Sequence, residues 1–578
     1  MENHKSWINN YSKFDLSELS QKLINNIIIS LNNKNLIKAD DFEFSNKEID
    51  LIYRWSLYVS SSTFLERLIK IINKKIFKKN KIKKNINYFY NLNSLDFSYN
   101  YYNNSDLNAR LINDIIGIFS SENIEIKPDS INTQKNKNFF FQKNYTINGL
   151  KNFIKRNYYK LNFLTKSEKY IYENCIWLNA IFKKKQIIKD IGSNEYEINK
   201  KFRSQLRECF KKEFIKTLNN KIFHEIKLSE QTKNNLSKLF SFWVDCSIPK
   251  SLIEGINFKL NFYKKYIQNK KIKFVHVCTG IYANDNIKLL CLLCKRNKIK
   301  IIGHDHGINN FVSFYNKENN KLNFYKGLFQ FYYEDIFFSW GAKKLDIWDQ
   351  VETKTNIKIF NIGSVYLNNL GKYKKTKVNH DIFTILYPEC PSRKFMANLE
   401  EITTEENSIH KENVIKFFKL LLIKNKKINI IYKNFDGNYH DDYFKLSFQR
   451  EIQNKSVIIS NIKPTELMHT VDLVLFDMLS TGFAESICSE VPSIIFSNTH
   501  DYELASNDGK LINDLLYKNK LLFYKISDGL DIILRFSENK LNYFESNKNL
   551  IDKFKKNICY PVSKKKFLFK MNKILLNE

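Results

Sequence analysis

Short apolar strands that alternate with helical segments dominate the chain from about residue 270 onward. Residues 272–277 favour a buried strand, residues 285–296 a helix, and residues 298–302 a second strand that ends at Gly303. Two consecutive strands joined by a helix normally belong to one parallel sheet, because a parallel pair needs a long crossover connection. Two further strands, each closed by a glycine, are predicted at 336–341 and 357–363.

A second series of the same kind follows a polar linker at 371–379. Its strands are short and apolar, as expected where helices cover both faces of a sheet. Strands are predicted at 382–387, 428–432, 457–460, 472–476 and 492–496, with helices at 410–424 and 464–471. Two such series predict an α/β protein with two Rossmann-like domains that face a cleft.

The chain before these series is predicted to be mainly helical, with apolar residues at three-and-four spacing in residues 1–85 and helical patterns again at 145–245. The Asn- and Tyr-rich stretch 88–104 gives no assignment. We predict a helical N-terminal region that faces the acceptor or a membrane, two Rossmann-like domains and a basic helical tail, at 1–250, 251–375, 376–540 and 541–578.

The formal net charge of +33 comes mainly from lysine, which is enriched together with Asn and Ile, the signature of an AT-rich genome. Lysine is less suited than arginine to bidentate phosphate recognition, so we expect no specific nucleic-acid partner. The lysine runs at 74–79 and 81–84 fit either a solvated surface or contact with an anionic membrane or glycan.

Cysteine usage and hydropathy limit the class of protein further. Cys291 and Cys294 have the spacing of metal ligands, but they lie in an apolar helical stretch with no second pair, so we expect core packing. No signal peptide and no run of 18 apolar residues is apparent in the sequence. We therefore expect a cytoplasmic protein, with peripheral contact at the inner face of the cell membrane.

The turn after the strand at 472–476 carries the strongest functional signal. Ser480, Thr481 and Gly482 precede a predicted helix, whose first turn offers free N–H groups and the positive end of the dipole to a phosphate. The hydroxyls add donors, glycine permits close approach, and Glu485 one turn later can accept hydrogen bonds from ribose. The alternative is an ordinary helix cap built from Ser480 and Glu485.

The order of several short motifs resembles one family of enzymes across residues 245–525. The C-terminal half looks like the nucleotide-sugar domain of GT-B glycosyltransferases, and is similar to a family of bacterial surface-polysaccharide transferases related in architecture to capsular Kdo transferases. The motifs are His304-Asp305-His306-Gly307, Phe338-Ser339-Trp340-Gly341, Pro388 to Arg393, Ser480 to Ser486, Pro492 to Phe496 and Tyr502-Glu503-Leu504. The resemblance implies a GT-B fold and a nucleotide-sugar co-substrate, with no bound cofactor or metal.

The loop His304-Asp305-His306 is the predicted source of the catalytic base. An inverting transferase must remove a proton from the acceptor hydroxyl, and Asp305 or His306 has suitable chemistry, with the other as its orienting partner. Metal binding by the two histidines and the carboxylate is the alternative, but one-residue spacing in a loop is a weak metal signal.

Other residues at strand ends are secondary candidates. Arg393, in a loop after a strand, is a candidate phosphate clamp, with a solvated loop residue as the alternative. Lys433, at the end of its strand, is a candidate to pair with the donor pyrophosphate or a sugar carboxylate. Four residues after the strand at 272–277 are candidates for the acceptor or cleft, against a loop-and-cap role: Thr279, Gly280, Asn284 and Asp285.

Together these features predict a glycosyltransferase that moves a sugar from a nucleotide donor to a cell-surface glycan or glycolipid. CMP-linked acidic sugars are one donor class implied by the resemblance. The alternatives are a polyol-phosphate transferase or nucleotide-sugar epimerase on the same fold, and a basic RNA- or membrane-binding protein without catalysis, which would bind polyanions with a steep salt dependence.

Overall fold

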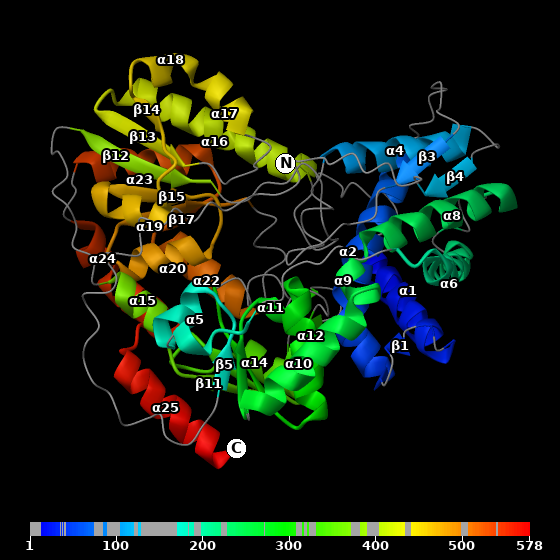
Figure 1. Cartoon of the computed structure of the whole chain (residues 1–578). Coiled ribbons are helices and arrows are strands. Elements are labelled where there is room, and N and C mark those ends of the chain that lie inside the picture. Colours follow the sequence, from blue (N-terminus) through cyan, green and yellow to red (C-terminus); the bar gives the residue numbers. More distant parts are fainter. Residues whose placement is uncertain are drawn as a thin grey trace.

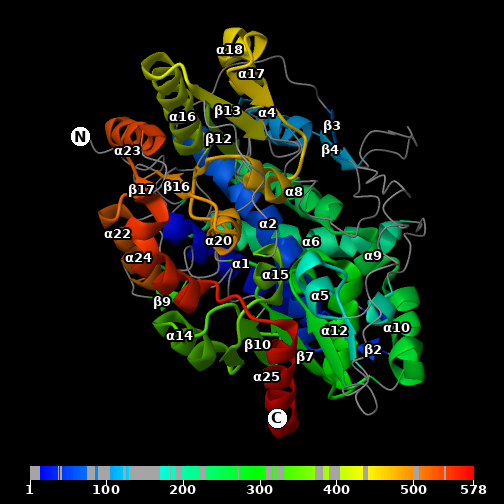
Figure 2. The same ribbon diagram turned by 90° about the vertical axis from the view of Figure 1, so that its left-hand side faces the viewer.

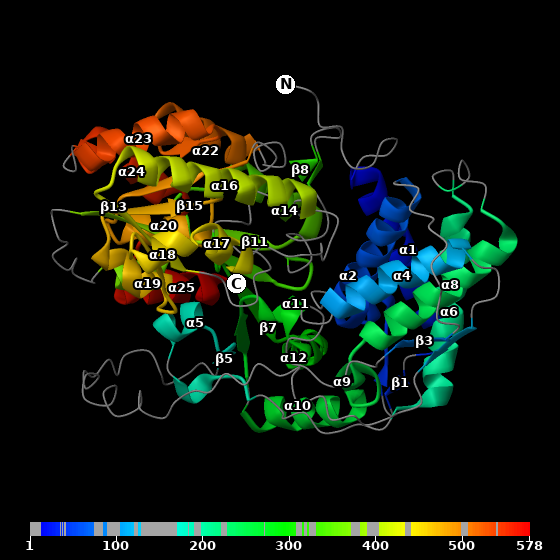
Figure 3. The same cartoon turned by 90° about the horizontal axis from the view of Figure 1, so that it is seen from above.

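The computed structural model shows a helical region beside two stacked α/β units (Figures 1 and 3). The N-terminal helices lie on one side, and the two parallel sheets with their helices lie on the other. The structure describes residues 13–34, 36, 38–39, 42–73, 85–88, 105–120, 125–128, 170–182, 184–189, 198–220, 223, 228–270, 272–307, 315–316, 321–322, 331–371, 382–389, 404–433, 441–498, 507–538 and 542–578.

Long helices pack around an aromatic core in the N-terminal region. Phe64 meets the rings of Phe214 and Phe240 edge-on at 5.3 and 5.2 Å, and those two rings stack at 4.1 Å. The helices are α1 (Lys13–Asn33), α2 (Asn46–Asn73), α4 (Ser105–Ser120), α6 (Lys200–Leu218) and α8 (Glu230–Ser247). Short strand pairs join β1 (Lys38–Ala39) to β2 (Phe42–Glu43), and β3 (Asn85–Tyr88) to β4 (Glu125–Pro128).

A buried ion network joins this helical region to the first α/β unit. The guanidinium of Arg203, in α6, donates to both carboxylate oxygens of Glu254 at 2.8 Å and to Asp245 at 3.1 Å. Glu254 lies between α9 (Lys250–Ile253) and α10 (Ile256–Lys270), which leads into the first sheet. Because a buried guanidinium needs such partners, the network fixes α6 against the start of that unit.

The first sheet is parallel throughout and follows chain order, β11-β10-β7-β6-β5. Val275 and Val277 belong to the core that includes α10 and α12, whereas Ile302 and Phe338 belong to the core that includes α5 and α25. Its strands are β5 (Tyr170–Tyr172), β6 (Phe274–Val277), β7 (Lys300–His304), β10 (Ile336–Ser339) and β11 (Lys358–Asn361). Its helices include α5 (Ile176–Ile181), α11 (Gly280–Ala283), α12 (Asp285–Arg296), α14 (Asp346–Thr355) and α25 (Lys564–Asn577).

The second sheet has the strand order of a doubly wound nucleotide-binding fold, β14-β13-β12-β15-β16-β17. Its order reverses between β12 and β15, and a crevice for ligands is expected at that switch point. The strands are β12 (Phe383–Pro388), β13 (Ile428–Lys433), β14 (Val457–Ile459), β15 (Leu473–Phe476), β16 (Ser493–Phe496) and β17 (Leu522–Phe523). The helices are α16 (Thr404–Lys424), α17 (Asp441–Ser447), α18 (Gln449–Gln453), α19 (Pro464–Leu467), α20 (Thr481–Cys488), α22 (Asn507–Lys518) and α23 (Ile526–Glu538).

The C-terminal segment crosses from the second unit back to the first. Helix α24 (Asn542–Ile558) packs on α20, where the rings of Phe554 and Phe483 are 5.5 Å apart. The backbone of Tyr560 then donates to Trp340 at 2.9 Å and accepts from Ser364 at 2.8 Å. Helix α25 then packs on the first sheet. The two units are therefore joined by this C-terminal segment as well as by α15 (Val365–Leu370).

The alternation of strands and helices predicted beyond residue 270 is confirmed, with strand ends that shift by one or two residues. Helix α16 begins six residues before its predicted start, and the helix predicted at 464–471 is α19 followed by a 3-10 turn at Met468–Thr470. The mainly helical prediction for 145–245 is wrong at β5, whose three residues are too few to show a period. The two-residue strand β17 was not predicted for the same reason.

Cys291 and Cys294 are buried in α12, as expected. Within the described part of the chain, no helix is long and apolar enough to cross a membrane.

Candidate active site

The loop after β7 holds a carboxylate in a fixed orientation. The Oδ1 atom of Asp305 accepts from the backbone N–H of His306 at 3.1 Å, and Oδ2 accepts from that of Trp340 at 3.2 Å. The backbone N–H of Asp305 also donates to Phe338 at 3.0 Å, in line with the pairing of β7 and β10. With only 4% of its surface exposed, Asp305 is therefore positioned at the carboxyl edge of the first sheet.

The same loop touches the start of α20 in the second unit. Gly307 lies so close to Thr481 that a Cβ atom at position 307 would overlap the Thr481 hydroxyl oxygen. Gly482 has a similar role on the other side of the turn, because its added Cβ would lie 2.7 Å from the ring of Phe476. The loop predicted to carry the base and the turn predicted to bind phosphate are thus brought together.

The hydroxyl of Ser480, the residue before α20, does not cap that helix. Ser480 is the N-cap residue and its carbonyl accepts from Phe483 at 3.1 Å, yet its side chain makes no capping hydrogen bond. The alternative interpretation of Ser480 as a side-chain cap therefore does not describe this geometry. The free N–H groups and partial positive charge of the helix start face the junction of the two units.

A hydrogen bond between the two units holds Glu485. The hydroxyl of Tyr366, in α15, donates to Oε1 of Glu485 at 2.8 Å. Burial raises the pKa of Glu485 to about 7, and the Tyr366 hydrogen bond opposes that rise. A carboxyl group that titrates near neutrality can accept or donate a proton in hydrogen bonds to a bound ligand.

His306 lies over the indole of Trp177, with 5.6 Å between ring centroids. Burial lowers the pKa of His306 to about 4, so its imidazole is neutral at pH 7 and can accept a proton. Among the described residues, neither Nδ1 of His306 nor Nε1 of Trp177 has a hydrogen-bond partner, although both atoms are buried. Two buried polar atoms without partners, on rings in contact, are suited to a polar ligand.

His304 is as deeply buried as Asp305, with 4% of its surface exposed. Its Nε2 lies 2.9 Å from Nδ1 of His276, and the rings of Phe182 and Phe338 meet it edge-on at 6.1 and 5.3 Å. Burial lowers the pKa of His304 to about 3, and burial followed by the charge of His304 lowers that of His276. This pair is neutral and tightly packed, and His304 also lines the pocket at this edge of the sheet.

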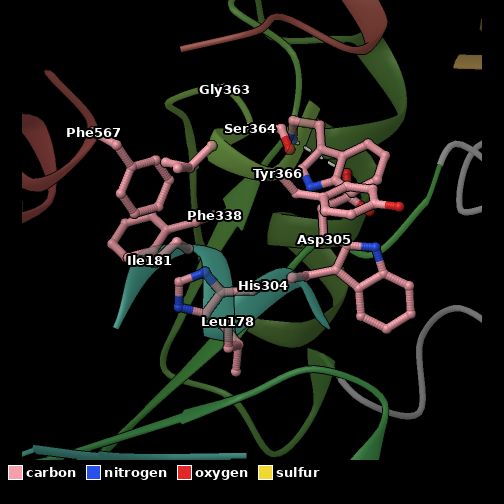
Figure 4. A pocket seen from close by; sticks show the side chains of 12 residues that line it. Leu178, Ile181, His304, Asp305, Phe338, Gly363, Ser364, Tyr366 and Phe567 are labelled. Carbon is pink, nitrogen blue, oxygen red and sulfur yellow. Dashed lines mark hydrogen bonds between the residues drawn. The ribbon is translucent and has the colours of Figure 1, made fainter. Parts of the chain in front are cut away.

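A pocket lies between α5, α25 and the carboxyl edge of the first sheet (Figure 4). Asp305 and Tyr366 lie on one side of it, and Phe338 and Phe567 on the other, with His304 between them. Its lining combines a few polar side chains with aromatic and aliphatic ones. The lining residues are Trp177, Leu178, Ile181, His304, Asp305, Phe338, Trp340, Gly363, Ser364, Val365, Tyr366 and Phe567.

A buried charge cluster occupies the switch point of the second sheet. Lys411, in α16, forms an ion pair with Glu389 at 3.1 Å and another with Asp477. Tyr387 donates to Asp477 at 3.0 Å, and Tyr432 donates to Glu389 at 2.6 Å. Glu389 and Asp477 follow β12 and β15, so the lysine ties together the two loops that border the expected crevice.

Of the remaining sequence candidates, those that the structure describes do not line the pocket. Asn284 caps α12 by accepting from Asn286 and Ile287 at 2.9 and 3.3 Å. Asp285 is buried against Ser251 and Lys288, which gives it a packing role. Thr279 and Gly280 belong to the loop that Glu173 holds by accepting from Gly280 at 3.0 Å. Lys433 ends β13, and Arg393 lies outside the described residues.

Five residues of this region were missed by sequence reasoning. Glu389 and Asp477 directly follow predicted strands, so a systematic search of strand ends would have found them. The other three have no local signal, because each reaches the site from an element distant in the chain: Trp177, Tyr366 and Lys411.

The architecture and the junction of two Rossmann-like units define a GT-B-type fold. The chain belongs to the LIC12162 family of transferases, whose sequence model matches residues 51–528. No curated protein sequence matches the chain.

Several solved structures are similar to part of the chain. One is UDP-GlcNAc 2-epimerase from Neisseria meningitidis bound to UDP-GlcNAc, with 12% identity over 56% of this chain and 82% of that chain, at a TM-score of 0.36. A second is a putative UDP-N-acetylglucosamine 2-epimerase from Listeria monocytogenes, with 12% identity over 54% of this chain and 82% of that chain, at a TM-score of 0.35. A third is the G117R mutant of TarM from S. aureus in complex with UDP, with 12% identity over 56% of this chain and 59% of that chain, at a TM-score of 0.36.

Proposed function

We propose that this transferase is a glycosyltransferase that moves a sugar from a nucleotide-sugar donor to a cell-surface glycan or glycolipid. One observation carries the proposal: the Asp305–His306 loop of the first unit meets the start of α20 in the second, at Gly307 and Thr481. The proposed proton acceptor and the proposed anion-binding helix start would therefore lie next to each other. Glycosyl transfer needs this pairing, because a hydroxyl loses a proton while a phosphate departs.

On the donor side, the nucleotide diphosphate or monophosphate would lie against the first turn of α20. The Ser480 and Thr481 hydroxyls and the helix N–H groups would stabilise the charge that develops on the leaving phosphate. Glu485 would accept hydrogen bonds from the ribose hydroxyls, with Tyr366 holding its other oxygen. Arg393 and Lys433 remain candidates for the pyrophosphate or a sugar carboxylate, and a CMP-linked acidic sugar is one donor class we propose.

On the acceptor side, we propose His306 rather than Asp305 as the base. The Nδ1 atom of His306 is buried and has no hydrogen-bond partner among the described residues, and the imidazole is neutral at pH 7, although burial makes it a weaker base than a solvated histidine. Asp305 instead directs both oxygens to backbone N–H groups, which suits a positioning carboxylate. We propose that the acceptor hydroxyl gives its proton to His306 as the bond from sugar to phosphate breaks.

Binding of a panel of CMP-, UDP- and GDP-sugars to the full chain tests this function. We expect one nucleotide class to bind saturably, and Ser480→Ala to weaken that binding while Ser527→Ala, an exposed serine at the start of α23, leaves it unchanged. Product analysis separates transfer from epimerisation. Turnover should persist in EDTA, since we propose no metal or other cofactor. Absence of both binding and hydrolysis across the panel would refute the proposal.

A further inference from the structure

Helix α25 has one buried face and one exposed face. Phe567, Met571 and Leu575 are buried against the first sheet, one helical turn apart, and Phe567 lines the pocket. On the opposite face, Phe569 and Leu576 expose 70% and 76% of their surfaces. Single exposed apolar side chains are common on protein surfaces, but here two of them share one face of a short helix.

Lysines flank the two exposed apolar residues. At 100° per residue, Lys565, Phe569, Lys573 and Leu576 fall on one stripe, with Lys566 at its edge. Helix α25 has five lysines and no acidic residue, and the carboxylate of Glu578 beyond its end pairs with Lys358. We call Lys565, Lys566, Phe569, Lys573 and Leu576 the outer face of α25.

The neighbouring helix α5 also has an exposed apolar residue next to one that lines the pocket. Both helices pack on the same face of the first sheet, and α5 lies near the upper end of α25 in Figure 2. Ile176, in α5, exposes 57% of its surface, whereas the next residue, Trp177, lines the pocket. Each helix therefore presents one side to the pocket and the other side to solvent.

We propose that the outer face of α25 docks on an anionic lipid membrane and brings the pocket to a lipid-linked acceptor. A basic, amphipathic helix with exposed Phe and Leu fits the interface of an anionic bilayer, where lysines contact the headgroups and apolar side chains enter the acyl boundary. The charge complementarity favours a membrane over a second copy of this basic chain. The acceptor half of the inference rests on the proposed function, whereas the docking half does not.

Co-sedimentation of the full chain with vesicles tests the docking. The vesicles contain phosphatidylcholine alone or an equal mixture with phosphatidylglycerol. We expect binding to the mixed vesicles only, and a loss of about tenfold or more in Phe569→Ser/Leu576→Ser and in Lys565→Glu/Lys573→Glu. The matched controls are Ile423→Ser/Leu511→Ser, which are both 67% exposed, and Lys426→Glu/Lys427→Glu on the other unit.

Three outcomes would overturn the inference: binding that the α25 variants do not weaken, binding that the controls weaken equally, or binding to RNA that exceeds binding to the mixed vesicles. Thermal melting of each variant shows whether it folds. Binding of the nucleotide sugar should be the same in the α25 variants and the parent. A chain that docks on vesicles but binds no nucleotide sugar would refute the proposed function and leave the docking intact.

Discussion

Tyr366 donates a 2.8 Å hydrogen bond to Oε1 of Glu485, and so joins α15 of the first unit to α20 of the second. The bond lies where the chain crosses between the units, beside the contact of Gly307 with Thr481. It links the protonation of one carboxyl group to the relative position of the two halves of the candidate site.

Replacing Glu485 by Gln should change the dependence of stability on pH. Burial raises the pKa of Glu485 in the folded state to about 7 from an ordinary 4.5. The contribution of Glu485 to the free energy of unfolding is therefore fully present below pH 4.5 and is lost as the pH rises through 7. At pH 8 we expect Glu485→Gln to be more stable than the parent by ~1–3 kcal/mol, a difference that shrinks below pH 5. Urea unfolding at pH 5 and 8 measures it.

Removing the Tyr366 hydroxyl should favour the protonated form of Glu485. The hydrogen bond lowers the pKa of Glu485, so Tyr366→Phe raises it further and shifts the pH at which the nucleotide sugar binds best. Binding titrations between pH 5 and 9 would reveal the shift. If Tyr366→Phe leaves the pH profile where it is in the parent, Glu485 does not contact the donor as proposed.

Gly307 should not tolerate a side chain. An alanine Cβ would overlap the hydroxyl oxygen of Thr481, so the loop or the helix start must move. We expect Gly307→Ala to weaken nucleotide-sugar binding and turnover by roughly tenfold, because small displacements at a reacting site have large effects on rate. Adding Thr481→Ala should recover part of the binding that Gly307→Ala loses. Equal activity in Gly307→Ala and the parent would show that the contact does not matter.

The His276–His304 pair should make the protein sensitive to acid. The pKa of His304 falls from 6.5 to about 3 on folding because the group is buried, so the folded state binds fewer protons than the unfolded state. Stability is therefore full above pH 6.5 and falls as the pH drops towards 3. The double variant His276→Leu/His304→Leu should lose much of this sensitivity in thermal melts.

The single variant His304→Leu provides the comparison for the pair. It leaves Nδ1 of His276 buried without its partner and should cost about 1–3 kcal/mol at pH 7, more than the double variant. A double variant less stable than the single one would show that packing, not the hydrogen bond, sets the energetics here.

The local architecture could be predicted from the sequence because its signals are local. The strand at 472–476 and the turn at Ser480 are encoded within a few residues, and the structure reproduces them as β15 and the start of α20. The partners of that turn could not be predicted. Tyr366 reaches Glu485 across 119 positions, and Trp177 precedes the predicted sheet by almost 100 residues, so only tertiary packing brings them together.

The strand β5 and the cluster around Lys411 illustrate two further limits. Three residues are too few for a period, and the helix pattern around Lys411 does not show that its ammonium group is buried between Glu389 and Asp477. Burial of a charge is decided by which elements pack together, whereas periodicity describes one element at a time.

Replacing Lys411 should disrupt the second unit at its switch point. Lys411→Met leaves Glu389 and Asp477 buried without their shared cation, and we expect a loss of ~3–5 kcal/mol in the free energy of unfolding. The loops after β12 and β15 would also separate, so binding of the nucleotide sugar should weaken more than stability alone explains. The triple variant Lys411→Met/Glu389→Gln/Asp477→Asn removes all three charges and should regain stability. If it regains binding as well, the lysine acts only through the fold; if binding stays weak, Lys411 positions the donor site.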